Sequence, residues 1–229
     1  VADLLREGAD PARTPLLYNG IGVPPRRQEM AGSRTGKRAE LGLGQGPVIV
    51  CVANLIPYKG HSDLIDAMAL VHRAVGDDWT LMMIGRDDGI GPGLVDRAEE
   101  AGLGTHIRFL GERSDIQDLL QVSDLFVLPS HEEGFSNAIL EAMAAELPVV
   151  AANVGGNPQA VEAGVSGMIV PPRNPQAMAA AIAKLLQDGG LRREMGAAGR
   201  RRVEDKFSLR ACLDEYDAMY RSLLAAGSG

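Results

Sequence analysis

The apolar residues of this chain fall into short runs separated by stretches with helical spacing. Six runs have the length of a buried strand: Val48–Ala53, Thr80–Ile84, Ile107–Leu110, Leu125–Leu128, Val149–Ala152 and Met168–Val170. Short apolar runs that alternate with helices are typical of parallel sheets. The pattern therefore predicts an α/β domain with a parallel sheet of about six strands and helices on both faces.

Helices are expected between and after these runs. In the first, His61–Val75, the residues Ala67, Leu70, Val71 and Ala74 recur at helical spacing. The others are expected at Leu94–Ala101, Ile116–Val122, Asn137–Ala145, Pro175–Leu186 and Leu191–Val203. A last helix, Leu209–Leu224, carries an apolar stripe that requires a partner.

Residues 1–47 are rich in Gly, Pro and Arg, and contain one candidate strand, Leu16–Tyr18, before the turn Asn19-Gly20. This segment is predicted to be a linker into the domain. The chain begins with Val, and its opening reads like the end of a helix. We therefore expect the chain to be a piece of a longer protein.

Composition places the chain among ordinary globular proteins. Of its 229 residues, 45% are hydrophobic and 23% are charged, and no apolar run approaches the roughly 20 residues that span a bilayer. No signal segment opens the chain, so a cytoplasmic location is expected. The net charge of −7 argues against nucleic-acid binding. The two cysteines, Cys51 and Cys212, are predicted to be separate buried thiols, without zinc.

Two glutamates, Glu133 and Glu141, flank the start of the helix Asn137–Ala145, which follows the strand Leu125–Leu128. Open α/β sheets bind ligands in such strand-to-helix loops. The helix N-terminus favours a phosphate, and a carboxylate accepts hydrogen bonds from sugar hydroxyls. Taken singly, Glu133 is explained as a charge that complements the helix dipole, and Glu141 as a solvent-facing helical residue. The full string between them, followed by Leu147-Pro148-Val149-Val150, favours a functional motif.

This string resembles the Glu-x7-Glu motif of retaining glycosyltransferases of the GT-B type, family four, which use nucleotide-diphosphate sugars. The resemblance implies a Rossmann-like domain that forms the C-terminal, donor-binding half of a GT-B fold. It places Glu133 near the donor sugar and Glu141 on the ribose hydroxyls. The turn that begins at Gly134 would hold the distal phosphate through the backbone N–H groups of Phe135, Ser136 and Asn137.

The loop after the first strand carries Lys59, which the resemblance places on the donor diphosphate. By itself, Lys59 reads as a solvated surface charge; its position at the carboxyl end of a strand favours the functional interpretation. Asn54 stands where the family has an arginine, which removes a permanent charge and a bidentate donor. The turn at Gly111 resembles the family's Phe-Leu-Gly turn beside the nucleotide base. Arg113 either stacks or pairs there or is a solvated surface arginine. The turn Gly155-Gly156 allows close approach to phosphate or sugar.

The resemblance also implies a domain plan and a mechanism. Residues 1–47 would link to a missing N-terminal lobe that holds the acceptor, 48–206 would bind the donor, and 207–229 would form a helix that crosses back to that lobe. We expect the chain alone to be inactive, and to self-associate through the exposed stripe of the last helix. Transfer would retain the anomeric configuration and need no metal or other cofactor. Lys59 would stabilise the leaving diphosphate and Glu133 would position the sugar.

Other functions fit parts of the pattern. A nucleotide-sugar epimerase of the same architecture and a non-catalytic sugar-nucleotide-binding module are the main alternatives, and Asn54 is the best support for the second. A dehydrogenase is disfavoured because the first loop lacks Gly-x-Gly-x-x-Gly. Family association points to polysaccharide synthesis, and peripheral membrane association of the full-length enzyme is compatible with it. The base, the sugar and the acceptor are not specified by the sequence.

Overall fold

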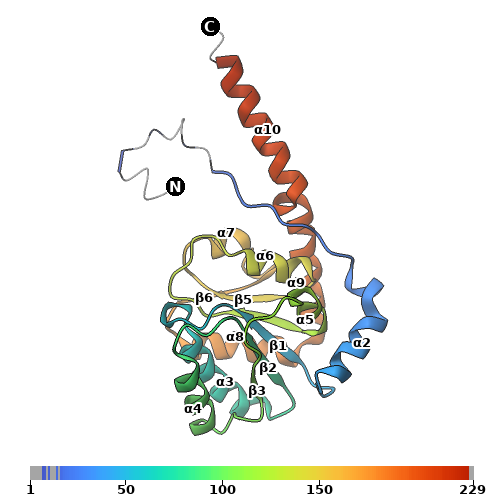
Figure 1. Ribbon diagram of the computed structural model, residues 1–229, viewed down its shortest axis with the longest axis vertical. Helices are drawn as coiled ribbons and strands as arrows, with labels where there is room; N and C mark the ends of the chain where they lie inside the picture. The colour runs from blue at the N-terminus through green and yellow to red at the C-terminus, as the bar shows by residue number, and fades with distance from the viewer. Residues whose placement is uncertain (1–6, 9, 11–13, 15, 227–229) are drawn as a thin grey trace.

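Six parallel strands form one sheet in the order β3-β2-β1-β4-β5-β6 (Figure 1). The computed structural model describes residues 7–8, 10, 14 and 16–226. The strands are β1 (Val48–Val52), β2 (Thr80–Ile84), β3 (Ile107–Phe109), β4 (Leu125–Leu128), β5 (Val149–Ala152) and β6 (Gly167–Val170). Each matches a predicted run to within one residue at either end. The predicted α/β class and parallel sheet are confirmed.

Helices connect the strands and follow the last one. They are α2 (Ala31–Glu40), α3 (His61–Val75), α4 (Gly91–Glu100), α5 (Ile116–Val122), α6 (Asn137–Ala144), α7 (Asn157–Ala160), α8 (Pro175–Gln187), α9 (Gly189–Arg202) and α10 (Leu209–Ala226). The described residues also contain three short non-α helical segments: η2 (Arg27–Met30), η3 (Pro57–Lys59) and the π-helical η4 (Val203–Phe207).

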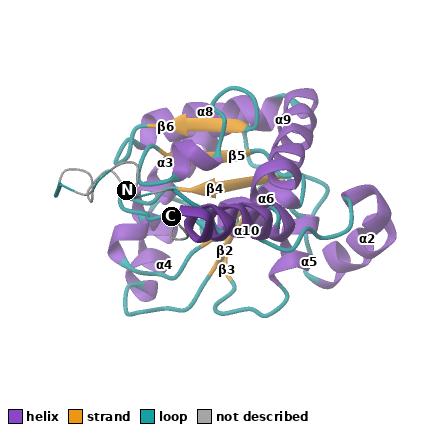
Figure 2. Cartoon of the chain, turned by 90° about the horizontal axis from the view of Figure 1, so that it is seen from above, coloured by secondary structure: helices purple, strands orange, loops and turns teal. Residues whose placement is uncertain are grey.

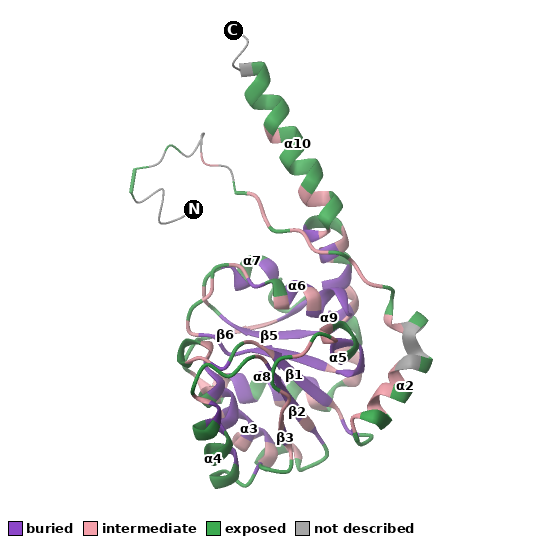
Figure 3. Cartoon of the chain, in the orientation of Figure 1, coloured by how far each residue is buried: buried purple, intermediate pink, exposed green. Residues whose placement is uncertain are grey.

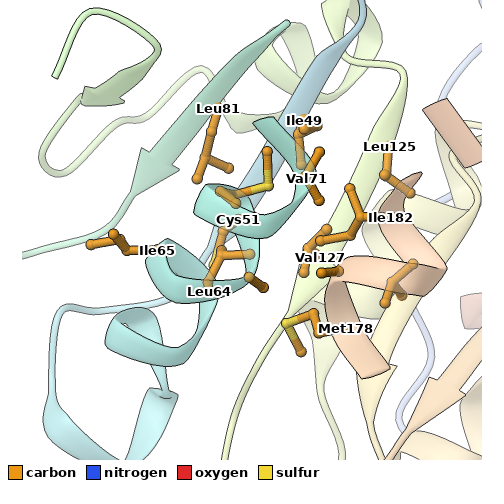
Figure 4. Packing of buried hydrophobic residues seen from close by; sticks show 14 of the residues in the cluster. Ile49, Cys51, Leu64, Ile65, Val71, Leu81, Leu125, Val127, Met178 and Ile182 are labelled. Carbon is orange, nitrogen blue, oxygen red and sulfur yellow. The ribbon is translucent and has the colours of Figure 1, made fainter. Parts of the chain in front are cut away.

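Alternate residues of each strand feed two separate hydrophobic cores. On β1, Ile49 and Cys51 pack with helices α3, α4 and α8, whereas Val48 and Val50 pack with α5 and α6 on the other face. Figure 4 shows Ile49 and Cys51 among side chains of α3 and α8. Because strand residues alternate between faces, a sheet that is covered on both sides has uniformly apolar strands. This explains the unbroken runs in the sequence.

The segment before β1 differs from the prediction. Leu16–Tyr18 is not a strand; the nearest pairing is a single parallel bridge between Ile21 and Ser208. Instead, residues 31–40 form helix α2, which lies beside α5 at the edge of the domain (Figures 1 and 2). The sequence of α2 is polar, and three of its basic residues form ion pairs with the domain: Arg34 and Arg38 with Asp124, and Lys37 with Asp115.

Helix α10 begins in contact with the domain and then extends away from it (Figures 1 and 3). Its start is fixed by Ile21, which donates to the Phe207 carbonyl at 2.9 Å and accepts from the Leu209 N–H at 2.8 Å. The predicted apolar stripe is exposed at Leu209, Leu213, Tyr216, Tyr220, Leu223 and Leu224. Within the described residues, no helix combines the length and apolarity needed to cross a membrane.

The two cysteines are free, as predicted, but the predicted burial is confirmed for Cys51 and wrong for Cys212. Cys51 is buried, and burial raises the pKa of its thiol to about 12. Cys212, at the start of α10, is only partly buried and donates to the Tyr18 carbonyl at 3.1 Å. Its thiol therefore helps to fasten α10 to the segment before β1.

Candidate functional site

The middle of the sheet contains a topological switch point between β1 and β4. The chain leaves β1 toward β2 on one side and later returns to β4 on the other, so the loops after these neighbouring strands diverge. Ligands of open α/β sheets bind in the crevice at such a point. The loop after β1 carries Lys59 and the loop after β4 carries Glu133. The predicted site residues therefore lie where this fold binds ligands.

Lys59 and Glu133 meet directly across the switch point. The ammonium Nζ lies 2.6 Å from Glu133 Oε1, and the hydroxyl of Ser130 donates to the same oxygen at 2.7 Å. The side chain of Glu133 is only 8% exposed, and that of Lys59 is 19% exposed. A buried charge is stable only if it is paired and hydrogen-bonded. Separate roles were predicted for Lys59 and Glu133, and the structure shows that the two side chains pair with each other.

Two further contacts fasten these loops together. The backbone N–H of His131 donates to the Tyr58 carbonyl at 2.7 Å, and its Nε2 lies 2.8 Å from Asp63 Oδ2. Gly60 has φ +71, and a Cβ there would collide with the Pro129 carbonyl. Only glycine accommodates both the left-handed conformation and this close approach. These hydrogen bonds and the close approach at Gly60 hold the loops after β1 and β4 against each other.

A third loop, after β5, closes against the loop that carries Glu133. The Gly156 N–H donates to the Gly134 carbonyl at 2.6 Å. Gly155 has φ +51, and a Cβ there would overlap the carbonyl oxygen of Glu133. The two glycines are therefore needed for the contact with the Glu133-Gly134 backbone. The approach of this turn to a phosphate or sugar stays a prediction.

Helix α6 begins at Asn137, as predicted, with Ser136 as its N-cap residue. The first N–H groups of a helix have no intrahelical acceptor, and their dipole favours an anion. The side chain of Ser136 does not cap this helix, and the first turn has no acidic residue. Asn137 uses its side-chain oxygen to accept from Asn19 at 3.3 Å. Within the described residues, no side chain of this turn caps these backbone N–H groups, which leaves them available to an anion.

Glu141 lies one turn inside α6 and is partly buried. Burial raises the pKa of its carboxyl group. Within the described part of the chain, the carboxylate has no hydrogen-bond or ion-pair partner. Keeping a partly buried acceptor without a partner costs stability, which is typical of a group that binds a ligand.

A cavity of about 400 Å³ adjoins Glu133 and the Gly155-Gly156 turn. It extends from the segment before β1 to the loops after β4 and β5, and its lining residues are Leu16, Leu17, Tyr18, Asn19, Glu133, Gly134, Phe135, Gly155, Gly156 and Gln159. The side chain of Glu133 is the charged group of this lining. Such a cavity suits a neutral polar molecule with hydroxyl groups.

Two predicted residues, Asn54 and Gly111, follow the ends of β1 and β3. Asn54 is exposed; its side-chain oxygen accepts from the Arg86 N–H at 3.2 Å, and its carbonyl lies 3.0 Å from His61 Nε2. Gly111 has φ +64, and its carbonyl accepts from the Gly85 N–H at 2.9 Å. Both therefore border the crevice with their backbones fixed. Their contacts with a nucleotide stay a prediction.

Arg113 is already engaged within the protein. Its guanidinium donates twice to Asp115, at 2.8 and 2.7 Å, and Lys37 of α2 lies 3.0 Å from the same carboxylate. These two cations hold the pKa of Asp115 well below its usual range. The contact of Arg113 with the base stays a prediction. To make that contact, Arg113 must either keep its hydrogen bonds to Asp115 or replace them with contacts to the base.

Sequence reasoning assigned no role to Ser130 or Asp63, because a serine in a strand-to-helix loop and an aspartate in the first turn of a helix have ordinary explanations. The available signal was the position of Ser130, two residues after an apolar strand and three residues before Glu133. Within the described residues, no three His, Cys, Asp or Glu side chains are grouped as metal ligands. Metal independence stays a prediction.

Comparison with known proteins agrees with this geometry. The chain is 34% identical over 226 residues to a D-inositol 3-phosphate glycosyltransferase of Segniliparus rotundus. The alignment covers 96% of this chain and 49% of that protein. It is 33% identical over 180 residues to the GDP-mannose-dependent alpha-(1-6)-phosphatidylinositol monomannoside mannosyltransferase of Mycobacterium tuberculosis, with 73% of this chain and 46% of that protein covered. This chain thus spans about half the length of these curated relatives.

Solved structures and family models give the same result. The crystal structure of Anabaena Alr3699/HepE in complex with UDP superposes with a TM-score of 0.87 at 26% identity, and covers 96% of this chain and 61% of that one. The similarity confirms the Rossmann-like GT-B architecture. The model of the family "Glycosyl transferases group 1" matches residues 33–202. The chain belongs to the glycosyl transferases group 1 family.

Proposed function

We propose that this chain is the donor-binding half of a retaining glycosyltransferase and that its ligand is a nucleotide-diphosphate sugar. The observation that carries the proposal is the pairing of Lys59 with Glu133 at the switch point, next to the N-terminus of α6. This arrangement offers positive charge for a diphosphate and a carboxylate for hydroxyl groups within one crevice.

In this proposal, each group acts on one part of the donor. The ammonium of Lys59 and the N–H groups at Ser136 and Asn137 stabilise the diphosphate as it departs. Glu133 orients the sugar, with one of its oxygens fixed by Ser130. Glu141, which is unpartnered within the described residues, accepts hydrogen bonds from the ribose hydroxyls.

A diphosphate that reaches Lys59 competes with Glu133 for its ammonium. Donor binding would then release part of the Glu133 carboxylate for sugar hydroxyls. Ser130 keeps that carboxylate in place during the exchange, because its hydrogen bond is independent of Lys59. The ion pair therefore suits a site that binds a phosphate and a sugar in the same event.

The names of related proteins support this ligand class. The similar Anabaena structure is a complex with UDP, and the mycobacterial relative is named as dependent on GDP-mannose. Both ligands contain a nucleoside diphosphate. The relatives are also named as transferases, which favours sugar transfer over epimerisation or ligand storage.

The proposal is tested by isothermal titration of the chain with UDP, GDP and ADP. We expect one nucleotide to bind best. Glu141→Gln should lower the affinity for that nucleotide roughly tenfold, which corresponds to the loss of one hydrogen bond to a charged group. Glu162→Gln serves as a control on an exposed carboxylate away from the switch point. Equal effects of both substitutions would contradict the proposal.

Retention of configuration and metal independence can be tested only on a protein that also includes an acceptor-binding lobe. We expect its product to keep the anomeric configuration of the donor, as read from the proton coupling of the anomeric position in NMR spectra. We also expect EDTA to leave its rate unchanged. An inverted product, or loss of activity with EDTA that a divalent metal restores, would overturn this part of the proposal.

A further inference from the structure

Two further cavities lie at the opposite end of the strands from Glu133. They measure about 450 and 430 Å³ and share Arg34, Asp124 and Arg192 in their linings. Asp124 directly precedes β4, and the other lining residues Pro47 and Pro148 directly precede β1 and β5. These cavities therefore lie at the amino ends of the strands, away from the switch-point crevice.

The linings of these cavities are strongly basic in a chain whose net charge is −7. They contain the carboxylates Asp124 and Glu146, together with five arginines: Arg27, Arg34, Arg38, Arg192 and Arg193. The five guanidinium groups of the linings outnumber their two carboxylates by three, and Asp124 is shared by Arg27, Arg34 and Arg38. Glu146 is moreover shared with Arg26, which lies 3.8 Å away. The region thus has an excess of positive charge.

Arg34 and Arg38 have structural roles that explain their presence. They donate to Asp124 and to backbone carbonyls at the end of α5, including that of Val122 at 3.3 and 3.0 Å. Arg38 also donates to the carbonyls of Gly44 and Gly46. These two arginines hold α2 against the domain.

The structural contacts of the other three arginines, Arg27, Arg192 and Arg193, use few of their hydrogen-bond donors. Arg27 uses Nη2 for Ser123 and Asp124, and Arg192 uses Nη1 for the carbonyls of Leu185 and Leu186. Arg193 makes no hydrogen bond or ion pair with any residue that the structure describes. A guanidinium group has five N–H donors, so most of the donors of these three side chains are unused within the described structure.

Two of these guanidinium groups converge on the start of α9. A Cβ built on Gly189 would lie 3.5 Å from Arg192 Nη2 and 3.6 Å from Arg193 Nη1. Guanidinium groups that approach the same point repel each other, and an anion between them offsets this repulsion. Planar guanidinium forks match the oxygen geometry of phosphate groups.

We propose that the arginine-lined cavity bounded by Arg27, Arg192 and Arg193 is a binding site for a phosphate-bearing anion, separate from the donor crevice. Burial lowers the pKa of Arg27 and of Arg34, and in each case a neighbouring arginine adds to the effect. A bound dianion would relieve both effects. The cavity has room for a phosphomonoester or a diphosphate.

The site is tested by titrating the chain with inorganic pyrophosphate. Arg193 is exposed, so Arg193→Gln removes one charge without disturbing the fold. Arg201→Gln is the matched control, because Arg201 is an exposed arginine of the same helix that lies outside the cavity lining. We expect Arg193→Gln to weaken pyrophosphate binding roughly tenfold, as loss of a charge-assisted hydrogen bond would, and Arg201→Gln to leave it unchanged.

Several outcomes would overturn the proposal. They are the absence of pyrophosphate binding, equal losses in the two variants, and binding that Arg193→Gln leaves intact, since the pyrophosphate would then occupy another site such as the donor crevice. Thermal unfolding of both variants shows whether the fold is kept. A double variant, Arg27→Gln with Arg193→Gln, should abolish the binding that remains.

A second measurement identifies the source of the phosphate. Cosedimentation with phosphatidylcholine vesicles is compared with and without phosphatidic acid. Binding that depends on phosphatidic acid and is lost in Arg193→Gln would assign the site to a lipid headgroup. Pyrophosphate binding without vesicle binding would assign it to a soluble phosphate compound. Both results support an anion site, and neither depends on the proposed donor function.

Discussion

Lys59 and Glu133 lie in loops that are 74 residues apart in the sequence, and their charged atoms are 2.6 Å apart at the centre of the sheet. The pair joins the loop after β1 to the loop after β4. It has both a structural and a chemical consequence, since one partner attracts phosphate and the other accepts hydroxyl groups. The two consequences can be measured separately.

The structural consequence is a strong energetic coupling between Lys59 and Glu133. Lys59→Met should destabilise the protein by about 3 kcal/mol, because it leaves a buried carboxylate without its counter-ion. Adding Glu133→Gln should recover part of that loss. Urea unfolding of the four proteins of this double-mutant cycle gives the coupling energy.

The exposed pair of Arg97 with Asp66 is the matched control for this cycle. Its nitrogen-to-oxygen distance is also 2.6 Å, but its side chains are 46% and 40% exposed. We expect a coupling energy below about 1 kcal/mol for this surface pair. A coupling for Lys59 and Glu133 that is no larger than the surface value would show that burial does not strengthen the central pair.

Glu141 should show a stability cost with a defined pH dependence. Burial raises the pKa of this carboxyl group, so the folded state retains its proton to a higher pH than the unfolded state does. The group therefore lowers stability as the pH rises above its ordinary value of 4.5, and has no such effect well below that value.

Glu141→Gln should accordingly raise the free energy of unfolding at neutral pH, and the gain should disappear in acid. The same substitution should weaken nucleotide binding. Denaturant unfolding at several pH values, together with titration of the nucleotide, tests both effects. Higher stability without any loss of affinity would mean that Glu141 does not contact the ligand.

Gly155 should be indispensable for the contact between the loops after β4 and β5. Gly155→Ala places a Cβ against the Glu133 carbonyl at φ +51, and we expect a loss of about 2 kcal/mol or more in thermal or denaturant unfolding. Gly164→Ala is the matched control, because Gly164 also has a positive φ of +82 but has no atom within 4 Å of the added Cβ. Equal losses would indicate backbone strain alone, without the predicted collision.

The exposed stripe of α10 should drive self-association of this chain. Leu213 and Tyr220 are 57% and 59% exposed, and both belong to the stripe. We expect sedimentation velocity to show a concentration-dependent dimer, and expect Leu213→Glu with Tyr220→Glu to restore a monomer, because burying the added charges is costly. A wild-type chain that stays monomeric at high concentration would contradict this prediction.

The sequence predicted the sheet well because its strands are buried on both faces. Val48–Val52 and Leu125–Leu128 are unbroken apolar runs, so their position does not depend on a subtle period. Helix α2 was missed because Gly32 and Gly36 lower its helical propensity, and because ion pairs of Arg34, Lys37 and Arg38 stabilise it. Such tertiary stabilisation is invisible in a local pattern.

The parts of the site that depend on local sequence were predicted, and the parts that depend on tertiary contacts were not. The position of Glu133 and Glu141 around the start of α6 follows from local signals. The contacts of Glu133 with Lys59 and of His131 with Asp63 do not, since they join segments 74 and 68 residues apart. They became predictable only once the strand order placed β1 beside β4.

The most direct test of the account is an NMR titration of the isotope-labelled chain with UDP and with GDP. If the donor binds at the switch point, the amide signals that move most are those of Lys59, Ser136, Asn137 and the Gly155-Gly156 turn, all at the carboxyl ends of the strands. Lys59→Met should suppress these shifts without changing the rest of the spectrum. Shifts confined to residues around Asp124 at the opposite edge, or no shift with either nucleotide, would contradict a donor site at the switch point.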